Sequence, residues 1–419
     1  MQYAELRQKE FALKILVLNA GSSSQKSRLY EIVNTDTLPE LAPTPLWQVD
    51  ADWTHHSGTT EVKISTASGA MLEESLHTDV RSEVIRHILK TLWSGKTQVL
   101  SQASEIDIVG HRVVHGGSEF EKSTLVTPEV KAVISRMAVL APMHNPANLE
   151  GIEVVERILP SVPQVAVFDT AFHRKMPLPA VVYSGPYEWF EQEIYRYGFH
   201  GISHQYCARR TAQILGKDLE SLRLITCHLG NGCSLAAIHH GHSIETTMGF
   251  TPLEGLMMGS RSGSIDPGIL LYLLQQKKYS VEQLDETLNK ASGLKGISGS
   301  SDMRQVLRDV KEGKSQAKLA FDMFVHRLRY YIGAMLATLG GLDALVFTGG
   351  IGENAAEVRE SVCESFAFLG LKLDAQKNAR SPADQHISPA DSAIPVLIIH
   401  TQEDWAIARE CWELASASG

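Results

Sequence analysis

Two arginines occupy stretches of sequence that are unusual for a cation. Arg112 lies in "GHRVVHGG" and Arg261 in "MGSRSG", each among glycines and apolar residues with few acidic neighbours along the chain. A guanidinium group matches the two oxygens of a carboxylate or phosphate with paired hydrogen bonds. An arginine is more often an exposed, solubilising residue. This setting instead favours anionic partners, such as a carboxylate or a phosphate.

Two turns rich in small polar residues interrupt apolar runs. "LVLNAGSSSQKS" contains Asn19, Ser22, Ser24 and Lys26, and "HLGNG" contains Asn231. Glycine lets a ligand approach the backbone, and these side chains offer hydrogen bonds. Each turn leads into a second strand-like run, which predicts two strand–loop–strand hairpins; a plain hairpin turn is the alternative to a ligand site. Neither turn contains the P-loop or dinucleotide-binding pattern, both of which place a helix after the glycines.

A third glycine-rich turn, "FTGGIGENAAEVRE", passes from a strand pattern into a helix pattern. The backbone N–H groups at the start of a helix favour negative charge. This turn is therefore a candidate for holding an anion or one edge of a nucleotide.

Apolar β-type runs alternate with helical patterns along the chain. Residues 316–339 predict a long helix that ends at Gly340 and Gly341, and Thr127 and Pro128 predict a helix start. This alternation indicates α/β layers. The two similar hairpins, more than two hundred residues apart, predict a duplicated domain. The expected strands are "KILVLNA", "IDIVGHRVV", "QVAVFDTAF", "LRLITCHLG", "DALVFTGG" and "IPVLIIHT".

The composition narrows the class of protein. A chain of 419 residues is long enough for two domains, and its net charge of −9 without a basic block argues against nucleic-acid binding. The first thirteen residues do not form a secretory signal, and no apolar run is long enough to cross a membrane. The five cysteines form no CxxC pair, and no His/Cys set has zinc spacing. We expect a cytoplasmic protein.

Ten stretches resemble the acetate kinase family of the actin-like and sugar-kinase superfamily. They occur in family order and span residues 14 to about 410, which makes the match far more specific than any single motif. The stretches are "NAGSSSQK", "GHRVVHGG", "APMHNP", "FDTAFH", "YRYGFHGISH", "CHLGNGCS", "TPLEGLMMGSRSG", "GISGSSDMR", "TGGIGEN" and "TQEDWAIAR".

The resemblance implies an α/β fold of two duplicated actin-like (ribonuclease-H-like) domains facing a nucleotide cleft. Residues 1–168, completed by 405–419, would form the N-terminal domain on the small-acid and magnesium side. Residues 169–404 would form the C-terminal, nucleotide-binding domain. The implied reaction is direct in-line phosphoryl transfer between ATP and acetate with Mg²⁺. The family also implies a homodimer, for which the helix of residues 316–339 is apolar enough, although it fits a core equally well.

The resemblance assigns roles to individual residues. Arg112 would bind the substrate carboxylate, while Asp169, His200 and Arg261 would be catalytic. Other motif histidines (His144, His173 and His204) receive no role, since a lone histidine is more often structural. Asn19 and Glu403 would hold Mg²⁺. The nucleotide site would comprise Lys26, His228, Leu229, Gly230, Asn231, Gly232, Asp302, Met303, Arg304, Gly350, Ile351, Gly352, Glu353 and Asn354.

The substrate limits what Asp169 has to do. A small carboxylic acid has a pKa of about 4–5 and is already ionised at neutral pH, so no general base is needed. We therefore expect Asp169 to orient a partner rather than to accept a proton. A covalent aspartyl-phosphate is an alternative that needs more steps. The methyl group of acetate is expected among Val114, Met143, Phe199 and Pro252.

Several positions depart from the family pattern. Ser264 stands where the family usually has Asp, Gln402 and Asp404 replace Asn and Glu, and Met143 replaces Leu. The changes at 402 and 404 put the fine geometry of Mg²⁺ binding in question.

Two rival functions remain open. One is a propionate or butyrate kinase on the same fold. The other is a non-enzymatic actin-like ATP-binding switch protein, which would not need an arginine pair for a carboxylate and a phosphoryl group.

Overall fold

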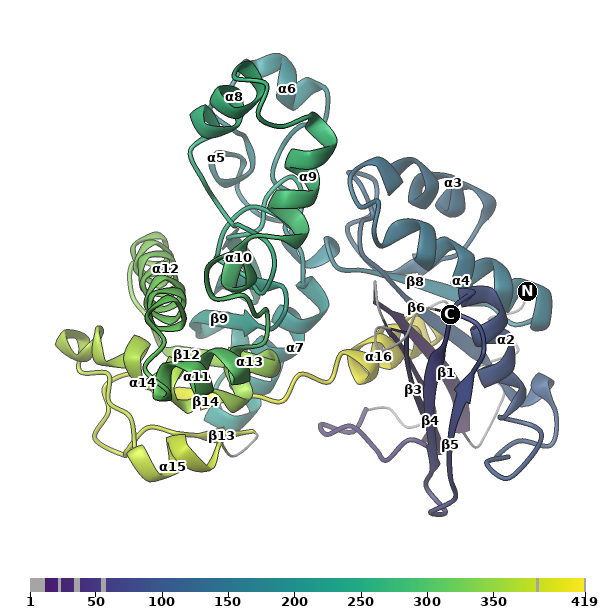
Figure 1. The fold of residues 1–419 in the computed structure, drawn as a ribbon. Coiled ribbons are helices and arrows are strands. Elements are labelled where there is room, and N and C mark those ends of the chain that lie inside the picture. Colours follow the sequence, from purple (N-terminus) through teal and green to yellow (C-terminus); the bar gives the residue numbers. More distant parts are fainter. Residues whose placement is uncertain (1–11, 22–23, 34–37, 54–57, 382–383, 418–419) are drawn as a thin grey trace. The chain divides into compact units, whose positions relative to one another are not determined.

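The chain forms two compact units, each built on one β-sheet (Figure 1). Unit 1 comprises Met1–Ala171 and Gln402–Gly419, and unit 2 comprises Phe172–Thr401. The computed structural model describes residues 12–21, 24–33, 38–53, 58–381 and 384–417. Ser22, part of the first glycine-rich turn, lies outside these ranges.

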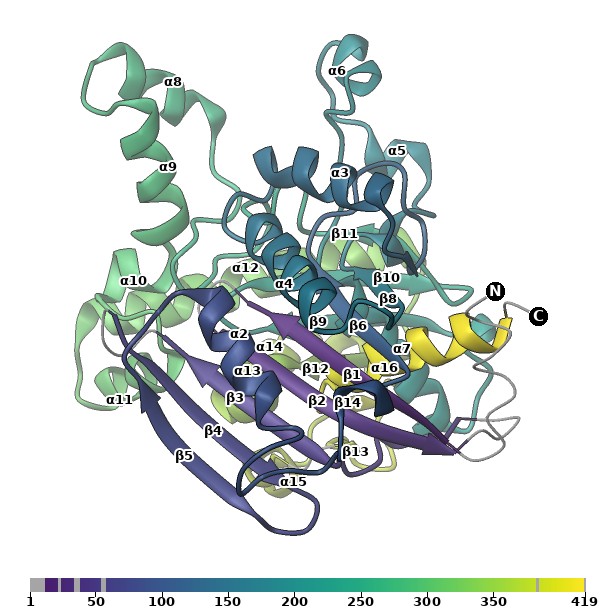
Figure 2. The same ribbon diagram turned by 90° about the vertical axis from the view of Figure 1, so that its right-hand side faces the viewer.

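Unit 1 contains an eight-stranded sheet in the order β5-β4-β3-β2-β1-β6-β8-β7 (Figure 2). Strands β1 and β2 are antiparallel, whereas β1, β6 and β8 run parallel to one another. The strands are β1 (Ala12–Ala20), β2 (Ser24–Val33), β3 (Trp47–Asp52), β4 (Thr60–Thr66), β5 (Met71–Leu76), β6 (Ile108–Val113), β7 (Thr124–Leu125) and β8 (Gln164–Phe168). The helices are α2 (Arg81–Lys90), α3 (Pro128–Arg136), α4 (Asn145–Ile158) and α16 (Glu403–Ala417).

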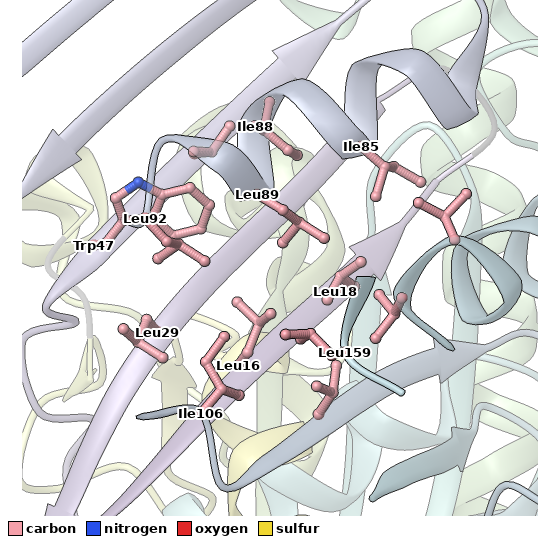
Figure 3. Close-up of a cluster of buried hydrophobic side chains, with 14 of the residues drawn as sticks. Leu16, Leu18, Leu29, Trp47, Ile85, Ile88, Leu89, Leu92, Ile106 and Leu159 are labelled. Carbon is pink, nitrogen blue, oxygen red and sulfur yellow. The ribbon is translucent and has the colours of Figure 1, made fainter. Parts of the chain in front are cut away.

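Helices α2 and α4 cover one face of this sheet. Alternate residues of β1, such as Leu16 and Leu18, point into a buried cluster with Ile85 and Ile88 of α2 (Figure 3). Trp47 is fully buried in this cluster, and its indole N–H donates to the hydroxyl of Thr91 at 3.2 Å. The period of two along a strand therefore explains one apolar face of β1.

The C-terminal helix α16 packs on the opposite face. Gly110 of β6 has no side chain, and a Cβ there would lie 2.7 Å from Ile407 and 2.6 Å from the sulfur of Cys411. Trp405 is fully buried and makes an edge-to-face contact with Tyr30 of β2. Residues far apart in the sequence thus complete one core.

Unit 2 contains a six-stranded sheet in the order β11-β10-β9-β12-β14-β13. Its strands are β9 (Arg223–Leu229), β10 (Cys233–His239), β11 (His242–Thr246), β12 (Ala344–Thr348), β13 (Gln385–His386) and β14 (Val396–Ile398). Its helices are α5 (Leu178–Val181), α6 (Tyr187–Glu191), α7 (Gly201–Leu215), α8 (Pro267–Gln275), α9 (Val281–Lys290), α10 (Gly293–Ser298), α11 (Met303–Lys311), α12 (Ser315–Leu339), α13 (Gly349–Asn354), α14 (Ala356–Glu364) and α15 (Ala375–Arg380).

The two sheets repeat one topology. In unit 1 the β1–β2 hairpin is followed by β6 and β8 on the other side of β1, in parallel. In unit 2 the β9–β10 hairpin is followed by β12 and β14 in the same relation to β9. Both predicted hairpins are confirmed, with Ala20 opposite Gln25 and Leu229 opposite Cys233 at the turns. The duplicated actin-like α/β fold is confirmed with them.

The helix signals in the sequence also hold. Thr127 caps α3, accepting from the backbone N–H of Val130 at 3.3 Å, and Pro128 is the first helical residue. The long helix α12 ends at Gly340, which adopts a left-handed conformation with φ 64°. Eight of its 25 residues are buried, and they pack within unit 2, so one face of α12 belongs to the core.

Helix α8 has a different character, since none of its residues is buried in this chain. Its sequence "PGILLYLLQ" is nearly all apolar, and Ile269, Leu271 and Tyr272 are 47%, 59% and 53% exposed.

No helix among the described residues is both long and apolar enough to cross a membrane. All five cysteines are buried and carry free thiols.

Candidate functional site: two sets of polar residues

The sheet of unit 1 gathers polar residues at one edge. Because β1, β6 and β8 are parallel, their carboxyl ends meet at the same edge. Asn19 lies near the end of β1, Arg112 near the end of β6, and Asp169 directly after β8. The first two residues of α16, Glu403 and Asp404, reach the same place. The structure thus brings together four predicted site residues and one position of departure.

Arg112 is the centre of this group. Its Nε and Nη2 both donate to Oδ2 of Asp169, at 3.1 and 2.7 Å, and its Nη1 donates to Oδ1 of Asn19 at 3.4 Å. The expectation that Arg112 has few acidic neighbours is therefore wrong in three dimensions, because Asp169 comes from another strand. A guanidinium has five N–H groups, so Nη1 and Nη2 each keep one further N–H that no described residue occupies. These remaining N–H groups can donate to a second carboxylate.

Asn19 is fixed by three neighbours. Its Nδ2 donates to Oδ1 of Asp404 at 2.9 Å and to Oε2 of Glu403 at 3.3 Å, while its Oδ1 faces Arg112. Asp404 in turn lies 3.5 Å from Nε of Arg28. The shorter acid at position 404 is thus held by Arg28 and Asn19 together.

Burial and charge oppose each other in this cluster. Burial raises the pKa of Asp169, and the charge of Glu403 raises it further, while Arg112 acts to lower it; the net shift is upward. Burial likewise raises the pKa of Asp404 against the opposing effects of Arg28 and Asn19. Burial alone would lower the pKa of Arg112, but its acidic neighbours raise it overall. Arg112 is therefore a permanent cation.

The same cluster fits a divalent cation of the Mg²⁺ type. Mg²⁺ binds few protein ligands, chiefly carboxylate and amide oxygens, together with water and substrate phosphates. Glu403 and Asp169 repel each other electrostatically, and a cation between substrate and protein would relieve that repulsion. No group of three or more His, Cys, Asp or Glu residues suited to a metal occurs within the described ranges. Such an ion would therefore depend on substrate oxygens as well.

In unit 2, helix α7 and the β9–β10 hairpin position the histidines. His200 precedes α7 in a left-handed conformation with φ 58°, and its Nδ1 lies 2.8 Å from the hydroxyl of Ser234. The His200 ring stacks on His228, with ring centroids 4.2 Å apart. A side chain in a left-handed backbone is uncommon and costs energy, so the surrounding contacts must hold it there.

Arg261 lies beside His200 and the turn of the second hairpin. A Cβ on Gly232 would lie 3.3 Å from Nε2 of His200 and 3.4 Å from Nη1 of Arg261. Arg261 Nη1 donates to the carbonyl oxygen of Pro252 at 3.0 Å. No carboxylate pairs with Arg261 among the residues that the structure describes, and burial lowers its pKa. An uncompensated, partly buried cation next to a histidine is a favourable place for an anion.

Three predicted nucleotide-binding segments converge on the same turn. The N–H of Gly259 donates to the carbonyl of Asn231 at 3.1 Å, and a Cβ on Gly259 would lie 3.1 Å from the carbonyl oxygen of Ser301, just before Asp302. A Cβ on Gly349, at the start of α13, would lie 2.8 Å from the carbonyl oxygen of Leu229. The turn 228–232, the segment 301–304 and α13 are therefore neighbours within unit 2.

Helix α13 differs from a simple anion site. Oε1 of Glu353 accepts from the N–H of Gly349 at 2.9 Å, and Oε2 of Glu353 lies 2.5 Å from Nδ1 of His400. A carboxylate thus already occupies part of the helix start. The pKa of Glu353 is lowered despite burial, chiefly by His400. This arrangement suits a neutral, hydroxyl-bearing edge of a nucleoside better than phosphate.

Other predicted residues also have structural partners. Asp302 caps α11, accepting from the N–H of Arg304 at 2.9 Å, and pairs with the exposed Arg304 side chain. Met303 is buried. Lys26, opposite Asn19 in the first hairpin, is exposed.

The four residues predicted around the methyl group belong to two units. Val114 is buried in unit 1, whereas Met143 is 54% exposed there. Phe199 and Pro252 belong to unit 2, where Phe199 is buried and Pro252 accepts the hydrogen bond from Arg261.

Sequence reasoning missed Arg28 as a member of the unit 1 cluster. A signal was available, because Arg28 follows Lys26 by two residues on β2 and so lies on the same face of the strand as Lys26. Its partner Asp404 is 376 positions away in the chain, and no local pattern links the two.

Comparison with known proteins identifies the family of the chain. A model of the Acetokinase family matches residues 14–409. An acetate kinase from Cyanothece sp. is 60% identical over 403 residues, covering 96% of this chain and 98% of that protein. The crystal structure of Porphyromonas gingivalis acetate kinase has a TM-score of 0.85 and 40% identity, covering 96% of this chain and all 100% of the other. A propionate kinase from Francisella tularensis has a TM-score of 0.86 and 39% identity, with coverages of 96% and 99%.

Proposed function

Because the chain belongs to the acetokinase family, we propose that it is an acetate kinase. It transfers a phosphoryl group reversibly between ATP and acetate, giving ADP and acetyl phosphate. The observation that carries this proposal beyond the family match is Arg261, a partly buried cation with no carboxylate partner in the described chain, beside His200 Nε2. Phosphoryl transfer depends on such donors, because negative charge spreads over the equatorial oxygens in the transition state.

On the acid side, Arg112 binds the acetate carboxylate through the N–H groups of Nη1 and Nη2 that are left over. Its Nε and Nη2 also donate to Asp169. Acetate is ionised at neutral pH, so its own oxygen is the nucleophile. Asp169 therefore acts by holding Arg112 in place. Direct in-line transfer also needs fewer steps than a route through an aspartyl-phosphate.

Asn19 and Glu403 are the residues that would hold Mg²⁺, with Asp404 and Arg28 fixing the amide of Asn19. When bound, the cation neutralises charge on the ATP phosphates. Lys26, exposed opposite Asn19, adds positive charge on the same side. In unit 2, residues 228–232, 302–304 and 350–354 bind ATP or ADP, and α13 with Glu353 takes the nucleoside.

The protein also functions as a homodimer in this proposal. Helix α8 supports it, because a nine-residue helix of nearly all apolar side chains with none buried needs a partner surface. Exposed Tyr187 and Trp189 on α6 add aromatic surface of the kind enriched at interfaces. The free thiols of all five cysteines suit a reducing compartment, and we assign the protein to the cytoplasm.

One assay tests the function. The protein is incubated with ATP, Mg²⁺ and acetate, propionate or butyrate, and any acyl phosphate is trapped with hydroxylamine. We expect acyl hydroxamate with acetate above all, less with propionate, and none without Mg²⁺. Preference for propionate would favour the propionate kinase alternative. ATP binding with no hydroxamate from any acid would favour the switch-protein alternative.

A further inference from the structure

Four side chains of unit 2 form a continuous line of hydrogen bonds that ends at His200. The Thr226 hydroxyl lies 2.7 Å from Nδ1 of His204, and Nε2 of His204 lies 2.7 Å from the Ser234 hydroxyl. The Ser234 hydroxyl lies 2.8 Å from Nδ1 of His200. His200 and His204 are one turn apart, with the N–H of His204 bonded to the carbonyl of His200 at 2.9 Å. Thr226 lies on β9 and Ser234 on β10.

The hydrogens along this line are not independent. His204 is fully buried, and burial lowers its pKa well below the usual value, so its ring is neutral and carries one N–H. One ring nitrogen of His204 therefore donates and the other accepts. Ser234 has a single hydroxyl hydrogen and lies between two ring nitrogens. The tautomer of His204 therefore determines which of these nitrogens receives that hydrogen.

Thr226 decides between the two possible directions. Its hydroxyl is fully buried, and Nδ1 of His204 is its one hydrogen-bond partner within the described residues. If His204 carried its hydrogen on Nδ1, the hydroxyl hydrogen of Thr226 would have no acceptor. A buried donor without an acceptor is the costly arrangement. The hydrogen of Thr226 therefore points to Nδ1 of His204, and His204 donates from Nε2 to Ser234.

We propose that Thr226, His204 and Ser234 form a one-directional hydrogen-bond chain that fixes neutral His200 with its hydrogen on Nε2. Ser234 donates to Nδ1 of His200, so the ring hydrogen of His200 must lie on the other nitrogen. That nitrogen is the one next to Gly232 and Arg261. His204 and Thr226 are thus positioning residues that act through His200.

This inference rests on the proposed function, in which His200 donates to the transferring phosphoryl group. With the hydrogens reversed, neutral His200 would present a lone pair at Nε2 and repel phosphoryl oxygens. The chain therefore lets His200 donate without first becoming a cation, and the stacked His228 ring need not tolerate a charge 4.2 Å away.

The test reads the tautomers directly. The full-length protein is labelled with ¹⁵N-histidine, and the His200 and His204 ring signals are assigned by their loss in His200→Gln and His204→Gln. At about pH 7.5 we expect both rings to be neutral, with Nε2 protonated and Nδ1 an acceptor. A hydrogen on Nδ1 of either ring, or a doubly protonated His200, would overturn the proposal. This measurement needs no substrate, so it stands even if the assigned reaction is wrong.

Variants add a kinetic readout. Ser234→Ala should lower kcat for acetyl phosphate formation about tenfold, the effect of one hydrogen bond, with KM for acetate changed less than twofold. His204→Leu should do the same, whereas His204→Gln, whose amide can still donate to Ser234, should retain most of kcat. The matched control is Ser243→Ala, which removes a buried hydroxyl bonded to His173 instead.

The outcomes separate the two levels of inference. If His204→Leu and His204→Gln lost kcat equally, or if the Ser243→Ala control lost as much, the hydrogen-bond chain would have only a structural role. Acetyl phosphate formation with Nδ1-protonated His200 would refute the chain and leave the function intact. Correct tautomers without any acyl phosphate would refute the function and leave the chain intact.

Discussion

Arg112 donates two hydrogen bonds to a single oxygen of Asp169, Oδ2, from Nε at 3.1 Å and from Nη2 at 2.7 Å. This contact fixes the plane of the guanidinium. In the proposed function it gives Asp169 an orienting role, which does not involve proton transfer. An acid and an arginine at the ends of two strands thus form one ion pair, although they are 57 positions apart in the chain.

The first prediction concerns the charge of Asp169. Asp169→Asn keeps an oxygen that can accept from Arg112 but removes the negative charge that orients it. We expect kcat/KM for acetate to fall about 10–100-fold, the effect of a lost charged hydrogen bond, because a misoriented Arg112 binds the acid less well. The acidic limb of the pH–rate profile should persist, because no general base has been removed. A variant with near-normal activity that lacks the acidic pKa of the wild type would contradict the orienting role.

The second prediction separates the two arginines. Arg112→Ala should chiefly raise KM for acetate, by about 10–100-fold, because it removes a charged hydrogen bond to the bound acid. Arg261→Ala should chiefly lower kcat, by about 10²–10³-fold, because its contact forms in the transition state. Steady-state kinetics with acetate and ATP varied separately give both values. Identical kinetic profiles would refute this division of roles.

A third prediction treats Arg112 and Asp169 as a coupled pair for stability. Arg112→Ala leaves the buried Asp169 carboxylate without its partner, so unit 1 should be destabilised more than by Arg112→Ala together with Asp169→Asn. A double-mutant cycle of urea unfolding should give a coupling of about 1–3 kcal/mol. Additive effects of the two substitutions would show that the contact contributes nothing to folding.

The fourth prediction concerns selection among small acids. One methylene in an apolar pocket changes kcat/KM by about 10–200-fold, so propionate should react more slowly than acetate. Val114→Ala should lower the ratio of kcat/KM for acetate to kcat/KM for propionate. Val113→Ala is the control, since Val113 is buried in the core beside Phe168 and should change stability alone. A ratio that changes equally in both variants would show that Val114 does not contact substrate. Met143, 54% exposed, is expected to restrict the substrate less than Val114 does.

The fifth prediction uses the buried His111. Its ring bonds to Gln164 at 2.7 Å, and burial lowers its pKa from 6.5 to about 4. The unfolded state binds a proton between these values and the folded state does not. The free energy of unfolding should therefore rise with pH, by up to about 1.4 kcal/mol per pH unit from pH 4 to 6.5.

His111→Gln removes this titration but can still bond Gln164, so the slope should become smaller by about that amount. Tryptophan fluorescence suits the measurement, because five of the six tryptophans belong to unit 1, as does His111. An unchanged slope in the variant would place the titration elsewhere.

Local signals predicted the parts of the fold that depend on neighbouring residues. The cap at Thr127, the end of α12 at Gly340 and both glycine-rich hairpins follow from rules that act over a few positions. Strand β5, "MLEESL", was not identified, because it has no buried residue and its charges conceal the strand pattern. Edge strands of this kind are held by their neighbours more than by their own sequence.

For the site, the motifs located the residues but not their partners. Asp404 looked like a shortened ligand in the sequence, whereas in the structure it pairs with Arg28 and fixes Asn19. Likewise, Arg112 seemed to lack acids and is in fact bound to one. Contacts between distant segments arise from the parallel arrangement of the strands, which no local pattern encodes.

The helix α16 has a consequence for how the protein is made. Its residues cover the face of the first sheet at Gly110, yet they follow all of unit 2 in the chain. During synthesis the ribosome therefore releases a complete unit 2 sequence while the first sheet still lacks one of its coverings. Domains usually fold in the order in which they emerge. Here the amino-terminal unit must wait for α16, and with it for Glu403 and Asp404, so the polar edge of its sheet is completed only after all of unit 2 has been synthesised.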